Sequence, residues 1–530
     1  MKAKESRSAE GTAAAIGTVV ISKVLRFLIH MRPHLDEILG RLLVVLYGKR
    51  QFVDAEHAQV LFVEGDPAGN DATFDRDGDI PIGISNSRFN EHVGPEGRME
   101  EECASTLVAK FLHVEENEEL TDLLASTLFY DTHGECPNTH IAEMIKAATR
   151  VDPDSSLKIM NRATTMLEAM IVRKKYGIAA ISGEMTLAEI FKAWKDKQSD
   201  EIAANPDAFA HLERSIEKSM ARSEEVCELS YIVTSLFRRQ FYTDDQILDM
   251  IFETLDDMWY DQRRFWAKLE EIREEDRFIP IQALLKSGFG GDEKEATLKL
   301  YACYDDDMLT QKAARFAGAD IVVQVSSSYN VQIFTKSRPG LSLANPVKMI
   351  RWMELPFELR DKVSWQELSM PGTIRGVEHW YYFRKGQMFF NGSLTKRARP
   401  ALGPGRMSLQ AIVEVCQHAF HPDGVRLWCR KRGIAMNGKP RWNRLIAKPR
   451  NGRDQRPVKH AEQPAAASKG AVQAGDDMQS AFAKAEKAIE EAKKPIVSSK
   501  SVTKRAASSK KPKSKTGRKP SKKAAEAQKS

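Results

Sequence analysis

The segment LIHMRPHLDEI, residues 28–38, gathers side chains that commonly bind metal ions. It holds two histidines and two carboxylates within eight residues: His30, His34, Asp36 and Glu37. The apolar run before it predicts a buried strand that ends near His30. Because open α/β sheets bind their ligands at the carboxyl ends of their strands, these imidazole and carboxylate groups could converge on a cation such as Mn²⁺ or Mg²⁺.

A simpler interpretation of the same segment competes with a metal site. Pro33 directs the chain out of the strand, and a helix is expected over 34–47. Asp36 or Glu37 could therefore do no more than interact with the helix N-terminus, with His30 a hydrogen-bonded core residue. Taken alone, the segment favours this simpler interpretation, so the metal hypothesis depends on the rest of the chain.

The surrounding elements follow a strand–helix–strand order. Patterning predicts strands over 19–29, 59–64 and 80–84, and helices over 34–47, 102–112 and 119–134. Helical periodicity fills residues 153–277, and β-branched and aromatic alternation predicts strands within 319–335 and 378–393. We expect an α/β protein with five parts: an N-terminal extension 1–23, a parallel-sheet domain 24–152, a helical insertion 153–279, a smaller α/β domain 280–445 and a tail 446–530.

Composition indicates a globular protein of a reducing compartment, and we expect a cytoplasmic one. The chain has 530 residues, 42% of them hydrophobic, which is enough for more than one core. Its six cysteines are scattered without a CxxC pair. The apolar stretch 13–29 is interrupted by Lys23 and Arg26 and leads directly into the histidine cluster, so we expect a buried strand there and no signal peptide. No other segment has the length of a membrane span.

Charge is unevenly distributed along the chain. Residues 493–523 carry 13 Lys and Arg and no acidic residue, whereas residues 1–425 carry a net charge of −14. A tail of Lys, Ser, Ala and Pro has too little apolar surface to fold, so we expect disorder there. Its function could be to bind nucleic-acid phosphates, although a solubilising tail would have the same composition.

Three stretches in order resemble the motifs of a known family: residues 28–38, SNSRFNEH at 85–92 and FYDTHG at 129–134. They resemble the DHH phosphoesterase superfamily, and most of all its branch of MYG-type RNA exonucleases. That family's first motif has the form His-x-x-Pro-Asp-x-Asp-Ala, and a later motif ends in Asp-His-His. The resemblance spans roughly residues 24–150 and 318–425 and implies a DHH-like fold.

The resemblance also implies a site for one or two Mn²⁺ or Mg²⁺ ions. His30 and Asp36 match metal ligands, His34 stands where the family has aspartate, and Asp131 matches a later carboxylate. Asn90, Glu91 and His92 stand at the Asp-His-His positions. The implied metal ligands are therefore His30, His34, Asp36, Asn90, Glu91 and Asp131, and the residues that would orient the scissile phosphate are His92 and His133.

Two departures from the family pattern remove expected negative charges. Gly83 stands where the family has an aspartate, and Asn90 replaces another. Glu91 could restore one charge, and the nearby acidic stretch of Asp75, Asp77 and Asp79 another. Two functions therefore remain open: a metal-dependent phosphodiesterase or exonuclease acting on RNA, DNA or short nucleotides, and a nucleic-acid or nucleotide-binding module whose catalytic site has decayed.

The second α/β domain offers hydroxyl, amide and backbone donors that could hold a substrate phosphate. These candidates are Ser326, Ser327, Asn330, His379, Asn391, Gly392 and Ser393. Ordinary turn formation by Ser, Asn and Gly is the alternative. Two other motifs are set aside: DRDGDIPIGISN lacks the Gly and Glu of an EF-hand loop, and the Cys and His residues at 133–140 and 416–429 lack zinc-site spacing.

Overall fold

The computed structural model describes residues 23–434, apart from gaps at 66, 93–98, 100, 135, 180–182, 240, 287–292, 337, 361, 385 and 393–406. The extension 1–22, Ser393 and the tail 446–530 therefore lie outside the described residues. No helix in the described ranges is both long enough and apolar enough to cross a membrane.

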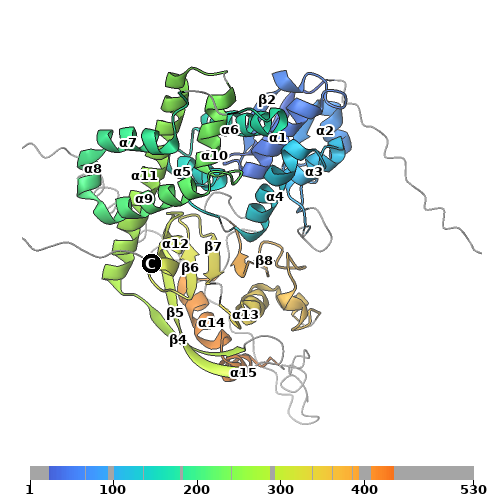
Figure 1. Ribbon diagram of the computed structural model, residues 1–530. Coiled ribbons are helices and arrows are strands. Elements are labelled where there is room, and N and C mark those ends of the chain that lie inside the picture. Colours follow the sequence, from blue (N-terminus) through green and yellow to red (C-terminus); the bar gives the residue numbers. More distant parts are fainter. Residues whose placement is uncertain are drawn as a thin grey trace, which may run out of the picture. The chain divides into compact units, whose positions relative to one another are not determined.

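The first sheet has three parallel strands in the order β2-β1-β3. They are β1 (Arg26–His30), β2 (Gln59–Val63) and β3 (Asp79–Pro81). Figure 1 labels β2 together with the nearby helices α1 (Leu35–Tyr47) and α6 (Ser156–Tyr176). The central strand β1 buries Phe27, Leu28 and Ile29, because it has a neighbour on each edge and helices pack against the sheet. The predicted strands are present, although β1 begins later and β3 ends earlier than the patterning suggested.

Helix α1 (Leu35–Tyr47) follows β1 directly and returns the chain to β2. A short helix α2 (Asp71–Asp77) leads into β3. The helices that follow are α3 (Ala104–Leu112), α4 (Glu118–His133) and α5 (Ile141–Val151). α1 packs closely against α3 and also contacts α4, which brings the end of α4 to the start of α1.

The predicted helical block consists of six helices in the described residues. They are α6 (Ser156–Tyr176), α7 (Leu187–Lys197), α8 (Ser199–Ala204), α9 (Pro206–Ala221), α10 (Leu229–Arg239) and α11 (Asp244–Glu275). One continuous buried cluster runs from Val24 to Trp259. The block therefore shares its hydrophobic core with the first sheet.

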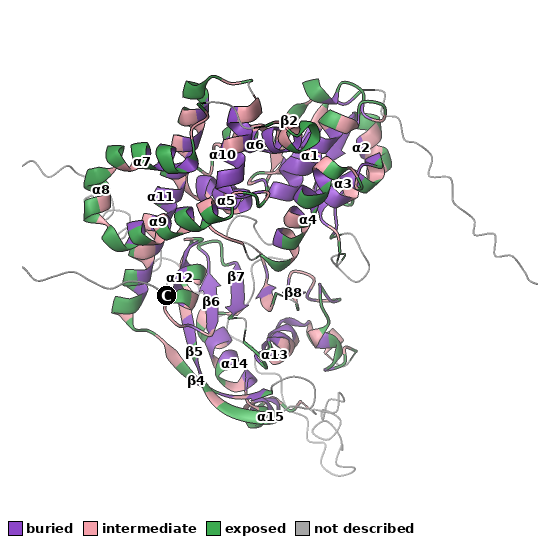
Figure 2. Ribbon diagram, in the orientation of Figure 1, coloured by how far each residue is buried: buried purple, intermediate pink, exposed green. Residues whose placement is uncertain are grey.

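The second sheet is mixed, with six strands in the order β4-β5-β6-β7-β9-β8. Its strands are β4 (Ile279–Lys286), β5 (Glu293–Tyr304), β6 (Ile321–Val325), β7 (Val331–Thr335), β8 (Tyr381–Phe383) and β9 (Met388–Phe390). Strands β6 and β7 are buried along their whole length, in contrast to α8, which buries no residue (Figure 2). The hairpin β4–β5 was not predicted from the sequence.

Four helices accompany this sheet: α12 (Thr310–Phe316), α13 (Ala344–Glu354), α14 (Leu409–Ala419) and α15 (Pro422–Lys431). Single 3₁₀ turns occupy Ala55–His57, Phe357–Leu359 and Glu367–Ser369. The second sheet has its own buried cluster, and the C-terminal half of α11 packs against α12, β5 and β6. The expected α/β class is confirmed, with one parallel sheet, one mixed sheet and many helices.

Candidate metal centre

Three of the predicted metal ligands lie together in the structure. Side-chain ligand atoms of His34, Asp36 and Asp131 all lie within 4.8 Å of one another. His34 and Asp36 come from the start of α1, and Asp131 comes from the last turns of α4. His34 is exposed, whereas Asp36 is buried. We call this group the His34–Asp36–Asp131 cluster.

The start of α1 determines where two of these ligands lie. His34 is the N-cap residue, and its backbone is extended, as is usual at an N-cap. The Glu37 carboxylate accepts a hydrogen bond from the His34 backbone N–H at 2.9 Å, which satisfies a donor that the helix leaves unpaired. This cap places Asp36 in the first turn, where the helix dipole stabilises a negative charge.

Glu37 is a buried carboxylate beside the cluster that the family resemblance did not single out as a ligand. Its other carboxylate oxygen forms a short contact with Nδ1 of His30. Burial raises the pKa of the Glu37 carboxyl, but the neighbouring His30 and His34 outweigh burial and hold that pKa below its usual value. Glu37 therefore adds a buried negative charge directly beside the cluster.

Gly83 owes its identity to this carboxylate. A Cβ atom added at Gly83 would lie 2.8 Å from Oε1 of Glu37, and the backbone φ of +69° is one that residues with side chains rarely adopt. The expected aspartate at 83 would thus occupy space that Glu37 fills. The sequence alone does not show this contact, so only the missing charge at Gly83 was considered.

His30 borders the cluster without belonging to it. The centres of the His30 and His34 rings are 6.5 Å apart. A carboxylate on Nδ1 orients an imidazole ring and favours a proton on that nitrogen, the arrangement common around metal-binding histidines. The alternative of a hydrogen-bonded core histidine describes the observed Glu37 contact equally well.

The stretch 85–92 lies outside the cluster. The Asn90 side chain donates to the Ser85 carbonyl at 2.6 Å and accepts from the His92 backbone N–H at 3.0 Å, so its amide holds this loop in shape. Glu91 is buried, with Oε1 3.1 Å from Nε2 of His92. The metal-binding role of Asn90 and Glu91 and the catalytic role of His92 stay predictions.

His133 is on α4, two residues after Asp131, and residues at that spacing do not share a helix face. Its ring stacks on Phe129 with ring centres 4.4 Å apart and contacts the Phe129 carbonyl. These contacts bind it to its own helix. The structure therefore does not bring His133 to Asp131.

The acidic stretch 75–79 is engaged elsewhere. Asp75 pairs with Arg88, Asp77 with Arg76, and Asp79 with Arg26. The first part of the stretch is the helix α2, which no EF-hand loop would contain. These acids are not among the residues that the structure groups with His34.

His140, the other histidine near Asp131 in sequence, is a structural residue. It caps α5 by accepting from the Ala142 backbone N–H through Nδ1, and Nε2 lies 3.0 Å from Oγ of Ser126. Because Nδ1 accepts, the proton is on Nε2, and the ring cannot serve as a base for Ser126. Burial lowers the pKa of His140 to about 4.

Most of the residues predicted to bind substrate gather around the turn between β6 and β7. Asn330 donates its backbone N–H to Ser326 Oγ at 3.1 Å, and Ser327 donates its backbone N–H to Asp306 at 2.8 Å. Asn391, beyond β9, accepts from the Val331 backbone N–H at 2.6 Å.

Gly392 approaches the Asn330 side chain so closely that a Cβ there would lie 2.6 Å from it. His379 is separate, 3.4 Å from the Glu354 carboxylate. Ser393 lies outside the described residues. These contacts are those of a stabilised turn, and binding of substrate there stays a prediction.

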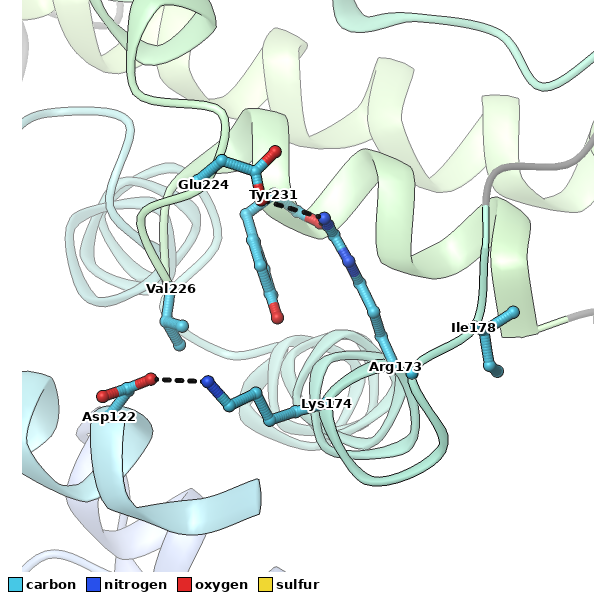
Figure 3. Close-up of a pocket in the computed structure, with 8 residues that line it drawn as sticks. Asp122, Arg173, Lys174, Ile178, Glu224, Val226 and Tyr231 are labelled. Atoms are coloured by element: carbon cyan, nitrogen blue, oxygen red, sulfur yellow. Dashed lines mark hydrogen bonds and ion pairs between the residues drawn. The ribbon is translucent and has the colours of Figure 1, made fainter. Parts of the chain in front are cut away.

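A polar cavity of about 260 Å³ lies between α4, which contributes Asp122, and α6, which contributes Arg173 and Lys174 (Figure 3). Its two cations are paired: Lys174 with Asp122 at 3.0 Å, and Arg173 with Glu224 at 3.6 Å. Figure 3 shows both cations directed at their carboxylates. The cavity therefore offers an anion little net charge, and Asp122 is roughly 13 Å along the helix from Asp131.

The donor set of the His34–Asp36–Asp131 cluster fits a divalent cation. One imidazole nitrogen and carboxylate oxygens suit Mn²⁺, and Mg²⁺ shares the preference for oxygen. Two carboxylates within 4.8 Å repel one another by roughly 3 kcal/mol at an effective dielectric constant of 20. A bound cation would turn this repulsion into attraction.

Comparisons with known proteins identify no family for this chain. No family model matches the sequence, and the search of curated proteins found no match. Among solved structures, the crystal structure of an uncharacterized protein from Helicobacter pylori G27 matches 62% of this chain and 89% of that chain, with 10% identity and a TM-score of 0.21. A likeness this weak carries no argument about fold or function.

Proposed function

We propose that this chain is a metal-dependent phosphodiesterase of the DHH type that acts on nucleic acid or short nucleotides. One observation carries the proposal: Asp131, distant in sequence, lies beside His34 and Asp36, which follow the carboxyl end of the central strand β1. Asp36 and Asp131 were matched to family ligands from the sequence, and His34 stands where the family has an aspartate. The buried Glu37 beside them supplies a charge that the family comparison had counted as lost.

The cluster residues would hold one Mn²⁺ or Mg²⁺ ion. His30, which Glu37 orients, would lie next to the cluster. A divalent ion bound there lowers the pKa of a coordinated water and stabilises negative charge on a phosphate. Asp36 and Asp131 would contribute the negative charge that retains the cation. The exposed His34 lies at the solvent side, where a phosphate can approach.

The basic segment 493–523 supports nucleic acid as the substrate class, because its 13 positive charges would release counterions from phosphates. The six cysteines are all free thiols, which suits the reducing cytoplasm that we propose as its location. A decayed binding module is the second candidate, and the loop-stabilising use of Asn90 at a family ligand position favours it.

The test measures bound Mn²⁺ and nucleotide release from labelled RNA and DNA with the full-length chain. Asp36→Ala and Asp131→Ala should each lower the affinity for Mn²⁺ and the rate of nucleotide release at least about a hundredfold, since each removes a ligand charge. Asp122→Ala is the matched control, because it removes a carboxylate from the same helix α4 outside the cluster. Equal and low metal content in wild type and Asp131→Ala would refute the metal site.

Activity in the same assay separates the two candidate functions. Asn90→Asp restores a family carboxylate and should raise nucleotide release in an enzyme. Background release by all variants, together with RNA binding that needs no metal, would favour the binding module. Removing residues 455–530 should weaken RNA binding and flatten its salt dependence in either case.

A further inference from the structure

Arg32 lies between His30 and His34 and has no carboxylate within salt-bridge distance among the described residues. Its Nη1 instead lies 3.1 Å from the thioether sulfur of Met308, which is a weak acceptor. The side chain is partly buried, and the Asp154 carboxylate attracts it without forming a salt bridge. Arg150 and Arg238 are paired with carboxylates, whereas the buried Arg351 donates to backbone carbonyls.

The backbone on both sides of Arg32 is fixed. Met31 donates its N–H to the Val63 carbonyl at 2.9 Å, and its own carbonyl accepts from the Ser156 hydroxyl. Pro33 and the N-cap His34 hold the following residues. The guanidinium is therefore presented from a rigid loop, which reduces the entropy that binding a ligand would cost.

The acidic loop next to Met308 does not neutralise Arg32, because its three carboxylates are engaged elsewhere. Asp305 pairs with Lys268 at 3.2 Å, and Asp307 pairs with Arg264 at 3.1 Å. Asp306 accepts from the Ser327 backbone N–H. Arg32 is thus two residues before His34 in the sequence, and the only hydrogen-bond acceptor that its guanidinium contacts among the described residues is the Met308 sulfur.

We propose that Arg32 binds the substrate phosphate directly, beside the His34–Asp36–Asp131 cluster. The inference rests on the proposed function and assigns the ligand chemistry of that site. A planar guanidinium can donate two parallel hydrogen bonds to phosphate oxygens. The Cα atoms of Arg32 and His34 are at most about 7 Å apart. A long arginine side chain that leaves Met308 could therefore reach a phosphate bound at His34.

The experiment measures binding of a fluorescent, 5′-phosphorylated RNA tetranucleotide to the full-length protein in Mn²⁺, with inorganic phosphate and an unphosphorylated, uncharged nucleoside as competitors. Arg32→Gln should weaken binding about ten- to a hundredfold. The affinity of Arg32→Lys should lie between those of the wild type and Arg32→Gln, because lysine keeps the charge and loses the paired donors. In a turnover assay, KM should rise more than kcat falls.

Arg50→Ala is the matched control, since it removes an exposed arginine at the opposite end of α1, roughly 20 Å away. Bound Mn²⁺ and thermal stability should stay unchanged in Arg32→Gln. A loss of Mn²⁺ in that variant, or binding no weaker than in Arg50→Ala, would overturn the inference. Competition by phosphate in wild type that Arg32→Gln abolishes would support it.

The outcomes also separate this inference from the proposed function. Turnover by the wild type with unchanged tetranucleotide binding in Arg32→Gln would leave the enzyme standing and reject Arg32. Absent turnover with Arg32-dependent phosphate binding would reject the enzyme and keep Arg32 as the phosphate-binding residue.

Discussion

The carboxyl end of β1 and the turn between β6 and β7 are both rich in polar side chains, but they use them differently. At β1, ligand atoms of His34, Asp36 and Asp131 face one another within 4.8 Å. At the second turn, Ser326, Asp306 and Asn391 each accept a hydrogen bond from a backbone N–H. Clustered polar side chains can thus form a candidate ligand site when their oxygen and nitrogen atoms face one another, or stabilise a loop when those atoms bind backbone N–H groups.

Gly83→Asp tests the first region most severely. If Gly83 only marks a missing charge, the aspartate should strengthen metal binding. The structure predicts weaker metal binding, because the new side chain would clash with the buried Glu37 carboxylate. Residue 83 also has a left-handed backbone, which strains any residue with a side chain. We expect the free energy of unfolding in urea to fall by about 4 kcal/mol and bound Mn²⁺ to drop.

Gly134→Ala is the control for this substitution, because it has the same φ of +69° and no atom within 4 Å of an added Cβ. Backbone strain alone should cost it about 1 kcal/mol. Equal losses in the two variants would show that the Glu37 contact does not matter.

His140 extends the comparison to a histidine that is used structurally. Its pKa is about 4 in the folded protein, mainly because of burial, against about 6.5 when unfolded. The unfolded chain therefore takes up a proton first as pH falls, and stability present above pH 6.5 is lost between roughly pH 6.5 and 4, by about 3 kcal/mol in total.

Urea unfolding of wild type and His140→Asn at pH 7 and pH 4.5 measures this loss, because asparagine can still cap α5. The variant should lose less stability than wild type on acidification, and its Mn²⁺ content should be unchanged. Identical pH dependence in both proteins, or loss of metal in the variant, would contradict the structural role.

Asn391→Ala tests the second region. Removing the side chain leaves the buried Val331 N–H without its acceptor, so the free energy of unfolding should fall by about 2 kcal/mol. Asn391→Asp keeps an acceptor oxygen and is the matched comparison. If Asn391 only stabilises the turn, nucleotide affinity will be unchanged in the folded Asn391→Ala protein; a tenfold loss of affinity would make the turn part of the substrate site.

Local patterns in the sequence were enough to predict several features. The helices over 34–47 and 119–134 correspond to α1 and α4 within a residue, because periodicity and caps depend on near neighbours in the chain. Asp36 and Asp131 were selected by motif resemblance, and the structure brings them together. The uneven charge between the body and the tail is a property of the sequence alone.

Only the tertiary structure decided which polar groups meet. Nothing local to Gly83 shows that it packs against Glu37. The two-residue spacing of Asp131 and His133 on the predicted helix, in contrast, already indicated that they lie on different faces. The β4–β5 hairpin could have been predicted, because its strands are adjacent in the chain and residues 287–292 between them include three glycines. Hydrogen bonds and ion pairs between distant segments depend on how whole helices pack, and packing is determined by contacts that the linear order of residues does not contain.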